Sequence, residues 1–276
     1  MSEIDLKTYQ AQKVEWVDNK KCIFNSVSFT SQEFLSRIDG CHKRLGKAVV
    51  ILGDSHGQEI FNALALNLGD KFLIGVTRGG CRPHTPEDEC QYREYLTFEK
   101  THKKMIKAVI FHQAGFYLLN DLSGKSGDRS LFSTTERIKG LPVYPINLNF
   151  VYKDIQYLDS LDESVPVIWL GPYIEPHYNV IDLVSHSQAC SGKIYPVPDN
   201  QIKTFNNLDR ELGNSVSRRS KITYVSIIPA LNFNWNKDLY DCKTVFWSDG
   251  DHWSTEGEAR FGARILNLLN SKSLFR

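Results

Sequence analysis

The chain has 276 residues, of which 41% are hydrophobic and 24% charged, and its formal net charge at pH 7 is +1. These values exclude a disordered chain, and the near-zero charge excludes a bulk basic surface for nucleic acid, although a local basic patch stays compatible with it. The longest apolar stretches, such as residues 48–52, are far shorter than the ~20 residues of a membrane-spanning helix.

Five short apolar segments predict β-strands. The first, residues 47–52, is rich in β-branched side chains and is bounded by Gly46 and Gly53, which is typical of a buried central strand. The others are residues 71–76, 108–111, 165–170 and 221–228. Helices are expected between Gly57 and Gly69 and over residues 93–107, 149–163, 201–216 and 254–271, the last with a capping-box pattern at Thr255 and Glu258.

Strands and helices alternate along the chain. This order predicts an α/β fold, a three-layer sandwich with a central, mainly parallel five-stranded sheet and helices on both faces. Residues 1–46 are predicted to be an N-terminal extension packed on the main domain, which spans residues 47–276, and residues 120–147 are predicted to be a long excursion.

Glycine-containing turns follow several predicted strands and are expected to lie along one edge of the sheet, where ligands bind in such folds. The first turn is Gly53–Gly57, with Ser55 at its centre. A serine there exposes its hydroxyl next to the free amides of a helix N-terminus, which can stabilise an oxyanion. Near the C-terminus, Asp249 and His252 are three residues apart, a spacing that lets the carboxylate orient the imidazole as a base for Ser55.

A metal-based alternative arises from the same turn. The string Gly53-Asp54-Ser55-His56-Gly57 also fits a metallophosphoesterase motif, in which Asp54 and His56 bind a metal. The further Gly-Asp and Gly-Asn-His strings that such a site needs are missing, so we favour Asp54 and His56 as turn-forming and packing residues. A third hypothesis is a glycan-binding module that kept the fold but lost the chemistry.

Six cysteines allow three interpretations. They are Cys22, Cys41, Cys81, Cys90, Cys190 and Cys242, with no C-x-x-C pair. They are buried thiols of a cytosolic protein, an even set of disulfides in an oxidising compartment, or, for Cys81 and Cys90 with His84, metal ligands. The short loops from Cys81 to Cys90 and from Cys22 to Cys41 favour disulfides.

The two blocks around Ser55 and His252 resemble the SGNH (GDSL-like) hydrolases, and the similarity extends over residues 40–266. It is closest to the SGNH domains fused to membrane acyltransferase-3 domains, which O-acylate bacterial surface polysaccharides. The segments that carry this resemblance are Cys41, Val50-Ile51-Leu52-Gly53-Asp54-Ser55-His56, Cys81-Arg82-Pro83, Cys90, Cys242 and residues 249–257.

The resemblance implies a serine O-acetyltransferase or O-acetylesterase. Ser55, His252 and Asp249 would form the catalytic triad. The oxyanion donors would be the Ser55 amide, Gly80 (preferred to Gly79) and Gln113, which replaces the asparagine of the wider superfamily.

Three residues near these blocks are candidates for substrate binding. They are Gly79, His112 and Trp253, with a core position as the alternative for Trp253.

The resemblance also implies a setting for the domain. No metal or organic cofactor is expected, and the partners would be a polysaccharide or oligosaccharide and a membrane domain that presents the acyl group, with no nucleic acid. The chain is expected to be a periplasmic or extracytoplasmic C-terminal part of a membrane protein. Disulfides are predicted for Cys81–Cys90, Cys22–Cys41 and Cys190–Cys242.

Overall fold

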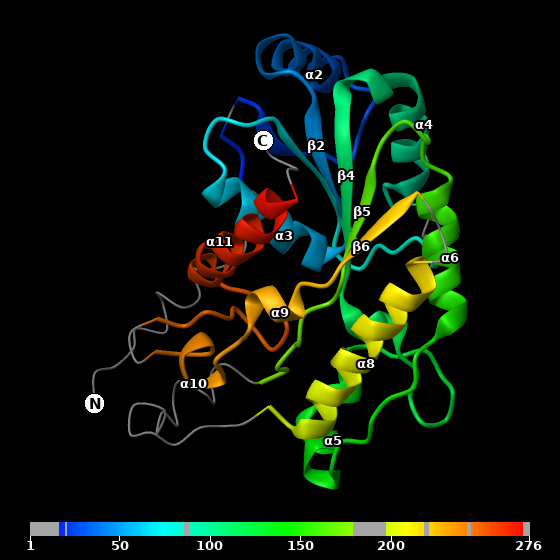
Figure 1. Cartoon of the computed structure of the whole chain (residues 1–276), viewed down its shortest axis with the longest axis vertical. Coiled ribbons are helices and arrows are strands. Elements are labelled where there is room, and N and C mark those ends of the chain that lie inside the picture. Colours follow the sequence, from blue (N-terminus) through cyan, green and yellow to red (C-terminus); the bar gives the residue numbers. More distant parts are fainter. Residues whose placement is uncertain are drawn as a thin grey trace.

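The computed structural model describes residues 17–19, 21–85, 89–178, 197–217, 221–241 and 244–272. In this part of the chain, six strands form one fully parallel sheet in the order β1-β3-β2-β4-β5-β6. Figure 1 shows its strands β2, β4, β5 and β6 side by side. The strands are β1 (Ile23–Asn25), β2 (Ala48–Gly53), β3 (Leu73–Thr77), β4 (Ile106–His112), β5 (Val167–Leu170) and β6 (Ile222–Val225).

The sheet has one strand more than the five predicted. The additional strand, β1, is three residues long and pairs in parallel with Leu73–Gly75 of β3. A segment of three residues is too short to show an alternation of apolar and polar side chains, so it is recognised as a strand only by its pairing with β3. The predicted α/β class with a parallel central sheet is otherwise confirmed.

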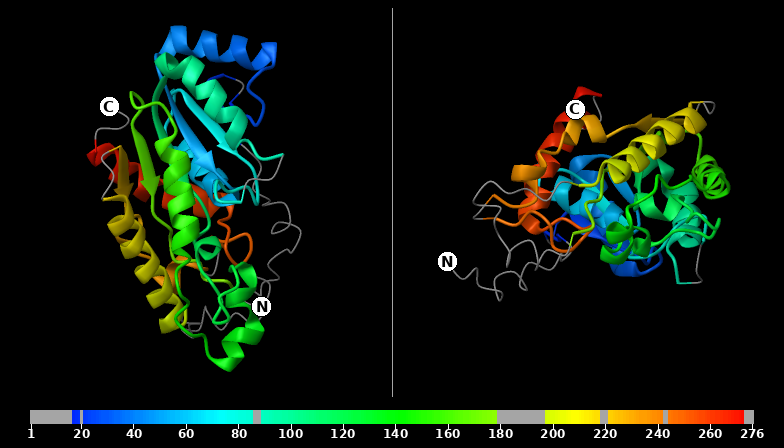
Figure 2. Two further views of the ribbon diagram at one scale, coloured as in Figure 1. Left: turned by 90° about the vertical axis from the view of Figure 1, so that its right-hand side faces the viewer. Right: turned by 90° about the horizontal axis from the view of Figure 1, so that it is seen from below.

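Helices cover both faces of the sheet (Figures 1 and 2). On β2, Val49 and Ile51 face a core shared with α3 and α11, whereas Val50 and Leu52 face a core shared with α2, α4, α6 and α8. The α-helices are α2 (Gln32–Leu45), α3 (Ser55–Asn67), α4 (Tyr92–His102), α5 (Thr134–Lys139), α6 (Leu148–Asp159), α8 (Asp199–Val216), α9 (Ile228–Leu231), α10 (Trp235–Asp238) and α11 (Thr255–Ser271). The 3-10 helices are η1 (Lys103–Met105), η2 (Gly115–Leu118) and η3 (Arg129–Phe132).

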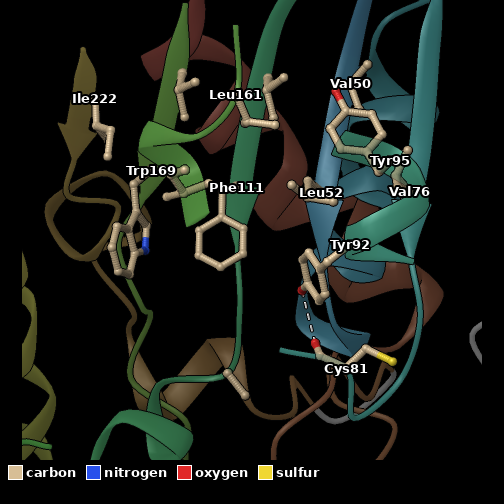
Figure 3. Packing of buried hydrophobic residues seen from close by; sticks show 14 of the residues in the cluster. Val50, Leu52, Val76, Cys81, Tyr92, Tyr95, Phe111, Leu161, Trp169 and Ile222 are labelled. Atoms are coloured by element: carbon tan, nitrogen blue, oxygen red, sulfur yellow. Dashed lines mark hydrogen bonds between the residues drawn. The ribbon is translucent and has the colours of Figure 1, made fainter. Parts of the chain in front are cut away.

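The larger core is made of aliphatic and aromatic side chains from the central strands. Phe111 of β4 and Trp169 of β5 pack edge to face with ring centroids 5.3 Å apart (Figure 3). Tyr92 at the start of α4 is buried in the same core and donates its hydroxyl to the backbone oxygen of Cys81 at 3.0 Å. This bond fixes the segment that follows β3 to the body of the domain.

Two expectations about helix ends are wrong. The helix predicted over 93–107 ends at His102, because Ile106 already pairs with Ala48 in the sheet and tertiary pairing outweighs the local helix preference of the lysine-rich segment. The last helix is capped by Ser254, whose Oγ accepts from Gly257 N at 3.1 Å, rather than by Thr255. The hydroxyl one residue upstream reaches the free amide of the first turn.

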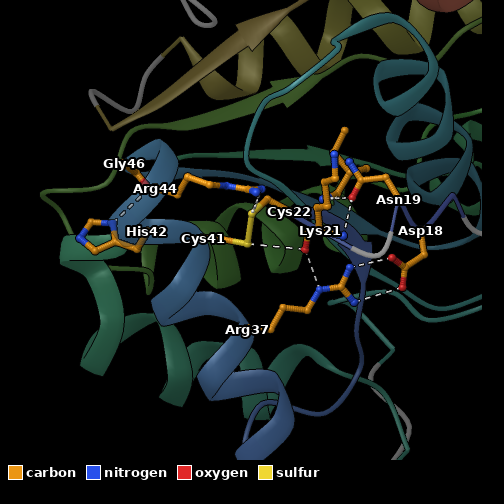
Figure 4. The surroundings of a disulfide bond; sticks show 10 residues. Asp18, Asn19, Lys21, Cys22, Arg37, Cys41, His42, Arg44 and Gly46 are labelled. Atoms are coloured by element: carbon orange, nitrogen blue, oxygen red, sulfur yellow. Dashed lines mark hydrogen bonds and ion pairs between the residues drawn. A yellow bond between two sulfur atoms is a disulfide. The ribbon is translucent and has the colours of Figure 1, made fainter.

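Two of the predicted disulfides are confirmed. Cys22 and Cys41 join the start of β1 to α2, and Arg37 of α2 pairs with Asp18 beside them (Figure 4). Cys81 and Cys90 close the loop between β3 and α4. The third predicted pair, Cys190–Cys242, lies outside the described residues. Within the described ranges, the helices are too short or too polar to cross a membrane.

Candidate active site

Ser55 is the first residue of α3 and comes two residues after the end of β2. Asp54 caps the helix, since its Oδ1 accepts from the backbone N–H groups of His56 at 2.9 Å and Gly57 at 3.3 Å. Its Oδ2 accepts from the backbone N–H of Ala114 at 3.0 Å. The predicted turn-forming role of Asp54 is confirmed, and the residue ties the serine turn to the end of β4.

The glycines of this turn allow the backbone of β2 to approach β4. A Cβ on Gly53 would lie 1.9 Å from the backbone oxygen of His112, and one on Gly57 would lie 3.0 Å from the same oxygen. A side chain at Gly53 would therefore push the two central strands apart. The glycine spacing around Ser55 is thus required by packing alone, before any chemistry is considered.

The structure brings Ser55, His252 and Asp249 together. His252 Nε2 lies 2.9 Å from Ser55 Oγ, and His252 Nδ1 lies 2.9 Å from Asp249 Oδ2 and 3.1 Å from Oδ1. Asp249 Oδ1 also accepts from the backbone N–H groups of Asp251 and His252 at 2.9 and 2.8 Å. The tautomer with its proton on Nδ1 satisfies Asp249 and leaves Nε2 free to accept the serine proton.

Charge and burial act in opposite directions on this dyad. Burial favours neutral His252, but the hydrogen bond to Asp249 and the electrostatic influence of the Glu59, Asp251 and Asp249 carboxyl groups outweigh it and raise the pKa of His252. Burial likewise opposes ionisation of Asp249, yet the hydrogen bonds from His252 and the backbone hold the pKa of Asp249 below its usual range. Asp249 is therefore an ionised hydrogen-bond acceptor beside the imidazole.

A second carboxylate, that of Asp251, lies beside the imidazole. Its Oδ1 is 3.7 Å from His252 Nδ1, and its Oδ2 is 3.4 Å from His56 Nε2. His56 is buried and stacks on Tyr173 with ring centroids 5.2 Å apart. Burial, and then the positive charge of His252, lower the pKa of His56 to about 3, so this ring is neutral at physiological pH.

Helix α3 also contacts the loop of residues 249–253, which carries His252 and is called the histidine loop below. Glu59 Oε1 accepts from the backbone N–H of Trp253 at 2.5 Å, and Glu59 Oε2 is hydrogen-bonded to the Tyr173 hydroxyl. That hydroxyl lies 2.9 Å from the backbone oxygen of Asp251. Burial raises the pKa of Glu59 well above its usual range. The buried carboxyl and phenol thus fix the backbone on both sides of His252.

The excursion between β4 and α6 supplies a further support through η3. Arg129 Nη2 lies 2.7 Å from Asp251 Oδ1 and 3.6 Å from Asp249 Oδ2. Phe132 stacks on His177 with centroids 4.8 Å apart, and His177 donates its backbone N–H to the oxygen of Gly250 at 2.5 Å. Both ends of this short helix therefore brace the loop that carries Asp249.

Of the predicted oxyanion donors, the Ser55 amide belongs to the first turn of α3, whose next two N–H groups are bound by Asp54. Gly79 lies next to the serine, since a Cβ there would be 4.0 Å from Ser55 Cβ. Gly80 has a φ of +76°, which favours glycine. The Gln113 side chain is buried, and its Nε2 donates to Asp154 Oδ2 at 2.6 Å.

The other predicted substrate-binding residues are enclosed. Trp253 is fully buried and stacks on Tyr173 with centroids 4.7 Å apart, which corresponds to the core position we considered as its alternative. His112, at the end of β4, is also fully buried, and its Nδ1 lies 3.1 Å from the backbone oxygen of Leu170. Burial lowers the pKa of His112 to about 3.

The structure contradicts the cysteine-based metal hypothesis, and in the metallophosphoesterase hypothesis it shows Asp54 already hydrogen-bonded to the backbone. Cys81 and Cys90 are joined in a disulfide and His84 Nδ1 lies 2.9 Å from Asp154, so the proposed ligand set of Cys81, His84 and Cys90 is wrong. Asp54, which a metallophosphoesterase would use as a ligand, has both oxygens on backbone N–H groups.

One group of described residues has the ligand types and spacing of a metal site. His56, Asp251 and His252 have ligand atoms within 4.8 Å of one another. Because Arg129 Nη2 is only 2.7 Å from Asp251, we assign these side chains to the hydrogen-bond network of the site.

Four further residues around the His252 imidazole were not predicted as site residues. Glu59, Tyr173 and Arg129 come from three segments far from His252, and no spacing in the sequence links them to it, whereas Asp251 directly precedes it. Asp251 alone carried a signal, because it stands between Asp249 and His252 in the second block. The others could be found only through their burial around the imidazole.

The fold is a parallel-sheet α/β sandwich in which Ser55, His252 and Asp249 meet at the carboxyl edge of the sheet. A family model described as "SGNH domain (fused to AT3 domains)" matches residues 22–267. The chain belongs to this family. No curated protein sequence matches the chain significantly.

Three solved structures are similar to the chain, and the first of them supports the same fold. The periplasmic domain of a lipopolysaccharide acetyltransferase from Salmonella ser. Paratyphi A is 17% identical, with a TM-score of 0.55 over 97% of this chain and 98% of that one. A putative platelet activating factor structure from Streptococcus pneumonia is 12% identical, with a TM-score of 0.42 over 84% of this chain and 88% of that one. An acetyl xylan esterase, AlAXEase, is 16% identical, with a TM-score of 0.42 over 80% and 98%.

Proposed function

We propose that this chain is a serine-dependent acyl-transfer enzyme, an O-acetyltransferase or O-acetylesterase. The observation that carries the proposal is the continuous hydrogen-bonded series from Ser55 Oγ through both nitrogens of His252 to Asp249. A serine hydroxyl is a weak nucleophile by itself, and this arrangement supplies both the base and the group that orients it.

In the first half-reaction, Ser55 Oγ attacks the carbonyl carbon of an ester while its proton passes to His252 Nε2. Asp249 stabilises the imidazolium that forms. The bond between the carbonyl carbon and the alcohol oxygen then breaks, and His252 returns the proton to the departing alcohol. Ser55 is left carrying the acyl group.

In the second half-reaction, a hydroxyl of the acceptor attacks the acyl-serine. His252 takes the acceptor proton and returns it to Ser55 Oγ as the ester bond to the serine breaks. A sugar hydroxyl as acceptor gives a transferase, and water gives an esterase. The chemistry of the protein side chains is identical in the two cases.

Negative charge on the carbonyl oxygen needs donors that are already in place. We propose the backbone N–H of Ser55 and that of Gly80 or Gly79 for this role. Because the Gln113 carboxamide is bonded to Asp154, we assign it a lower rank as a donor, where it would act only through its second N–H group.

The family supports a proposal for the substrate class, and the disulfides support one for the compartment. We propose an O-acetyl group on a bacterial cell-surface polysaccharide, with the acyl group presented by a membrane acyltransferase domain. The Salmonella neighbour, the periplasmic domain of a lipopolysaccharide acetyltransferase, supports this choice by analogy. Two disulfides favour an oxidising compartment, so we propose a periplasmic location.

We keep the proposed division into residues 1–46, an extension, and residues 47–276, the catalytic domain. The residues proposed for catalysis all belong to the second part. In the first part, β1 is an edge strand of the sheet paired with β3, and α2 packs on the core through the buried side chains of Phe34 and Ile38.

The test is hydrolysis of p-nitrophenyl acetate by the wild type and by Ser55→Ala, each with and without a chelator. We expect hydrolysis by the wild type, a loss of at least about a thousandfold in the variant, and no effect of the chelator. Equal rates in both proteins would exclude the serine mechanism. Loss of activity with the chelator alone would favour the metallophosphoesterase hypothesis, and glycan binding without any hydrolysis would favour the binding module.

A further inference from the structure

Two carboxylates face the same nitrogen of His252. Asp249 Oδ2 is 2.9 Å from Nδ1, and Asp251 Oδ1 is 3.7 Å from it. Nδ1 of a neutral imidazole has one proton to donate, so a closer approach of Asp251 would come at the expense of the bond to Asp249. The ring would also turn, which would move Nε2 away from Ser55.

One guanidinium nitrogen lies near both of these carboxylate oxygens. Arg129 Nη2 is 2.7 Å from Asp251 Oδ1 and 3.6 Å from Asp249 Oδ2. The oxygen of Asp251 that faces His252 has no hydrogen-bond partner of good geometry, but it forms an ion pair with Arg129 at a shorter distance than the one that separates it from His252. The positive charge also reduces the repulsion between the two carboxylates, which is large for close, poorly hydrated groups.

Burial makes this arrangement consequential. The Asp251 side chain is 1% exposed, whereas that of Arg129 is 54% exposed. A buried carboxylate without a neighbouring cation would approach another hydrogen-bond donor. Asp251 has two histidines beside it: His56, which is neutral and lies 3.4 Å away, and His252, which lies 3.7 Å away.

We propose that Arg129 is a positioning residue that holds Asp251 away from His252 Nδ1 and so leaves Asp249 as the sole partner of that nitrogen. The inference rests on the acyl-transfer function proposed above. It gives the excursion of residues 120–147 a role in catalysis, because η3 carries Arg129 to the histidine loop. Arg129 acts through Asp251 and His252 and makes no contact with Ser55 in the structure.

The first experiment compares Arg129→Met, Arg129→Lys and a control, Lys139→Met, with the wild type in p-nitrophenyl acetate hydrolysis. Lys139 is a surface cation of the neighbouring α5 that pairs with Glu136. We expect kcat to fall about 10- to 100-fold in Arg129→Met, with KM within about twofold, because only the alignment of His252 changes. Arg129→Lys keeps the charge and should recover most of kcat, and the control should match the wild type.

The decisive variant is the double substitution of Arg129→Met with Asp251→Asn. An uncharged carboxamide competes less for the Nδ1 proton, so the double variant should have a kcat at least about fivefold above that of Arg129→Met alone. An unchanged or lower kcat in the folded double variant would overturn the proposal, as would a full wild-type kcat in Arg129→Met. Melting curves identify a misfolded protein, in which case the lysine variant and the following measurement decide.

A spectroscopic measurement separates this inference from the proposed function. The Nδ1 proton of His252 should give a low-field ¹H NMR signal in the wild type that moves upfield in Arg129→Met and returns in Arg129→Lys. This signal needs no substrate, so it tests the positioning role even if the wild type hydrolyses no ester. The same low-field signal in all three proteins would refute the role of Arg129.

Discussion

Removing each of the two disulfides in turn should affect stability and activity differently: one removal should cost more stability, and the other more activity. The Cys22–Cys41 bond closes a loop of 19 residues and the Cys81–Cys90 bond one of 9 residues. The chain-entropy model gives a stabilisation of about 3.2 kcal/mol for the first and about 2.6 kcal/mol for the second. Replacing both cysteines of a pair by serine should therefore destabilise the protein slightly more at Cys22 and Cys41.

The loss of activity should depend on where each disulfide lies relative to Ser55, and not on the length of the loop that it closes. Cys81 directly follows Gly80, so this disulfide anchors the segment that lies beside Ser55, whereas Cys22 and Cys41 lie near the amino ends of the strands. The six residues of β2 separate the two ends of the sheet by about 20 Å. We expect a loss of about tenfold in kcat, or ~1.4 kcal/mol, for the Cys81/Cys90 variant.

The assay combines urea unfolding with p-nitrophenyl acetate kinetics at a temperature at which both variants are folded. The Cys22/Cys41 variant is the matched control, and its kcat should stay within about twofold of the wild type. The reasoning is refuted if the control loses as much kcat as the Cys81/Cys90 variant, or if the latter keeps full activity.

Two further predictions concern pH and packing. The hydrogen bond and carboxyl groups that raise the pKa of His252 should place the acid limb of kcat/KM above pH 6.5, with activity rising as the base loses its proton, and a midpoint at or below 6.5 would contradict this assignment. For packing, Gly262→Ala places a Cβ 2.4 Å from the backbone oxygen of Ala63, so it should lower the free energy of unfolding by about 1–3 kcal/mol. Gly40→Ala, a helical position with no neighbour within 4 Å, should instead raise it by about 0.5–1 kcal/mol, and urea unfolding measures both.

The fold class and the proximity of Ser55, His252 and Asp249 could be predicted from the sequence. Buried parallel strands are continuous apolar runs between glycines, so the segment before Gly53 could be recognised without a partner. Ser55 lies in a glycine-rich turn between a predicted strand and a predicted helix, and Asp249 is three residues before His252, a spacing at which the carboxylate can reach the imidazole. The location of these residues at one edge of the sheet could be predicted from the topology, because the carboxyl ends of parallel strands lie together.

Only the tertiary structure decided which side chains surround the triad. Trp253 could be placed either at the substrate or in the core, and burial against Tyr173 places it in the core. Arg129 lies in a polar excursion with no periodic pattern, yet it reaches Asp251 because η3 packs against the histidine loop. Contacts between residues more than 100 positions apart depend on how whole elements pack, and a local pattern in the sequence carries no information about them.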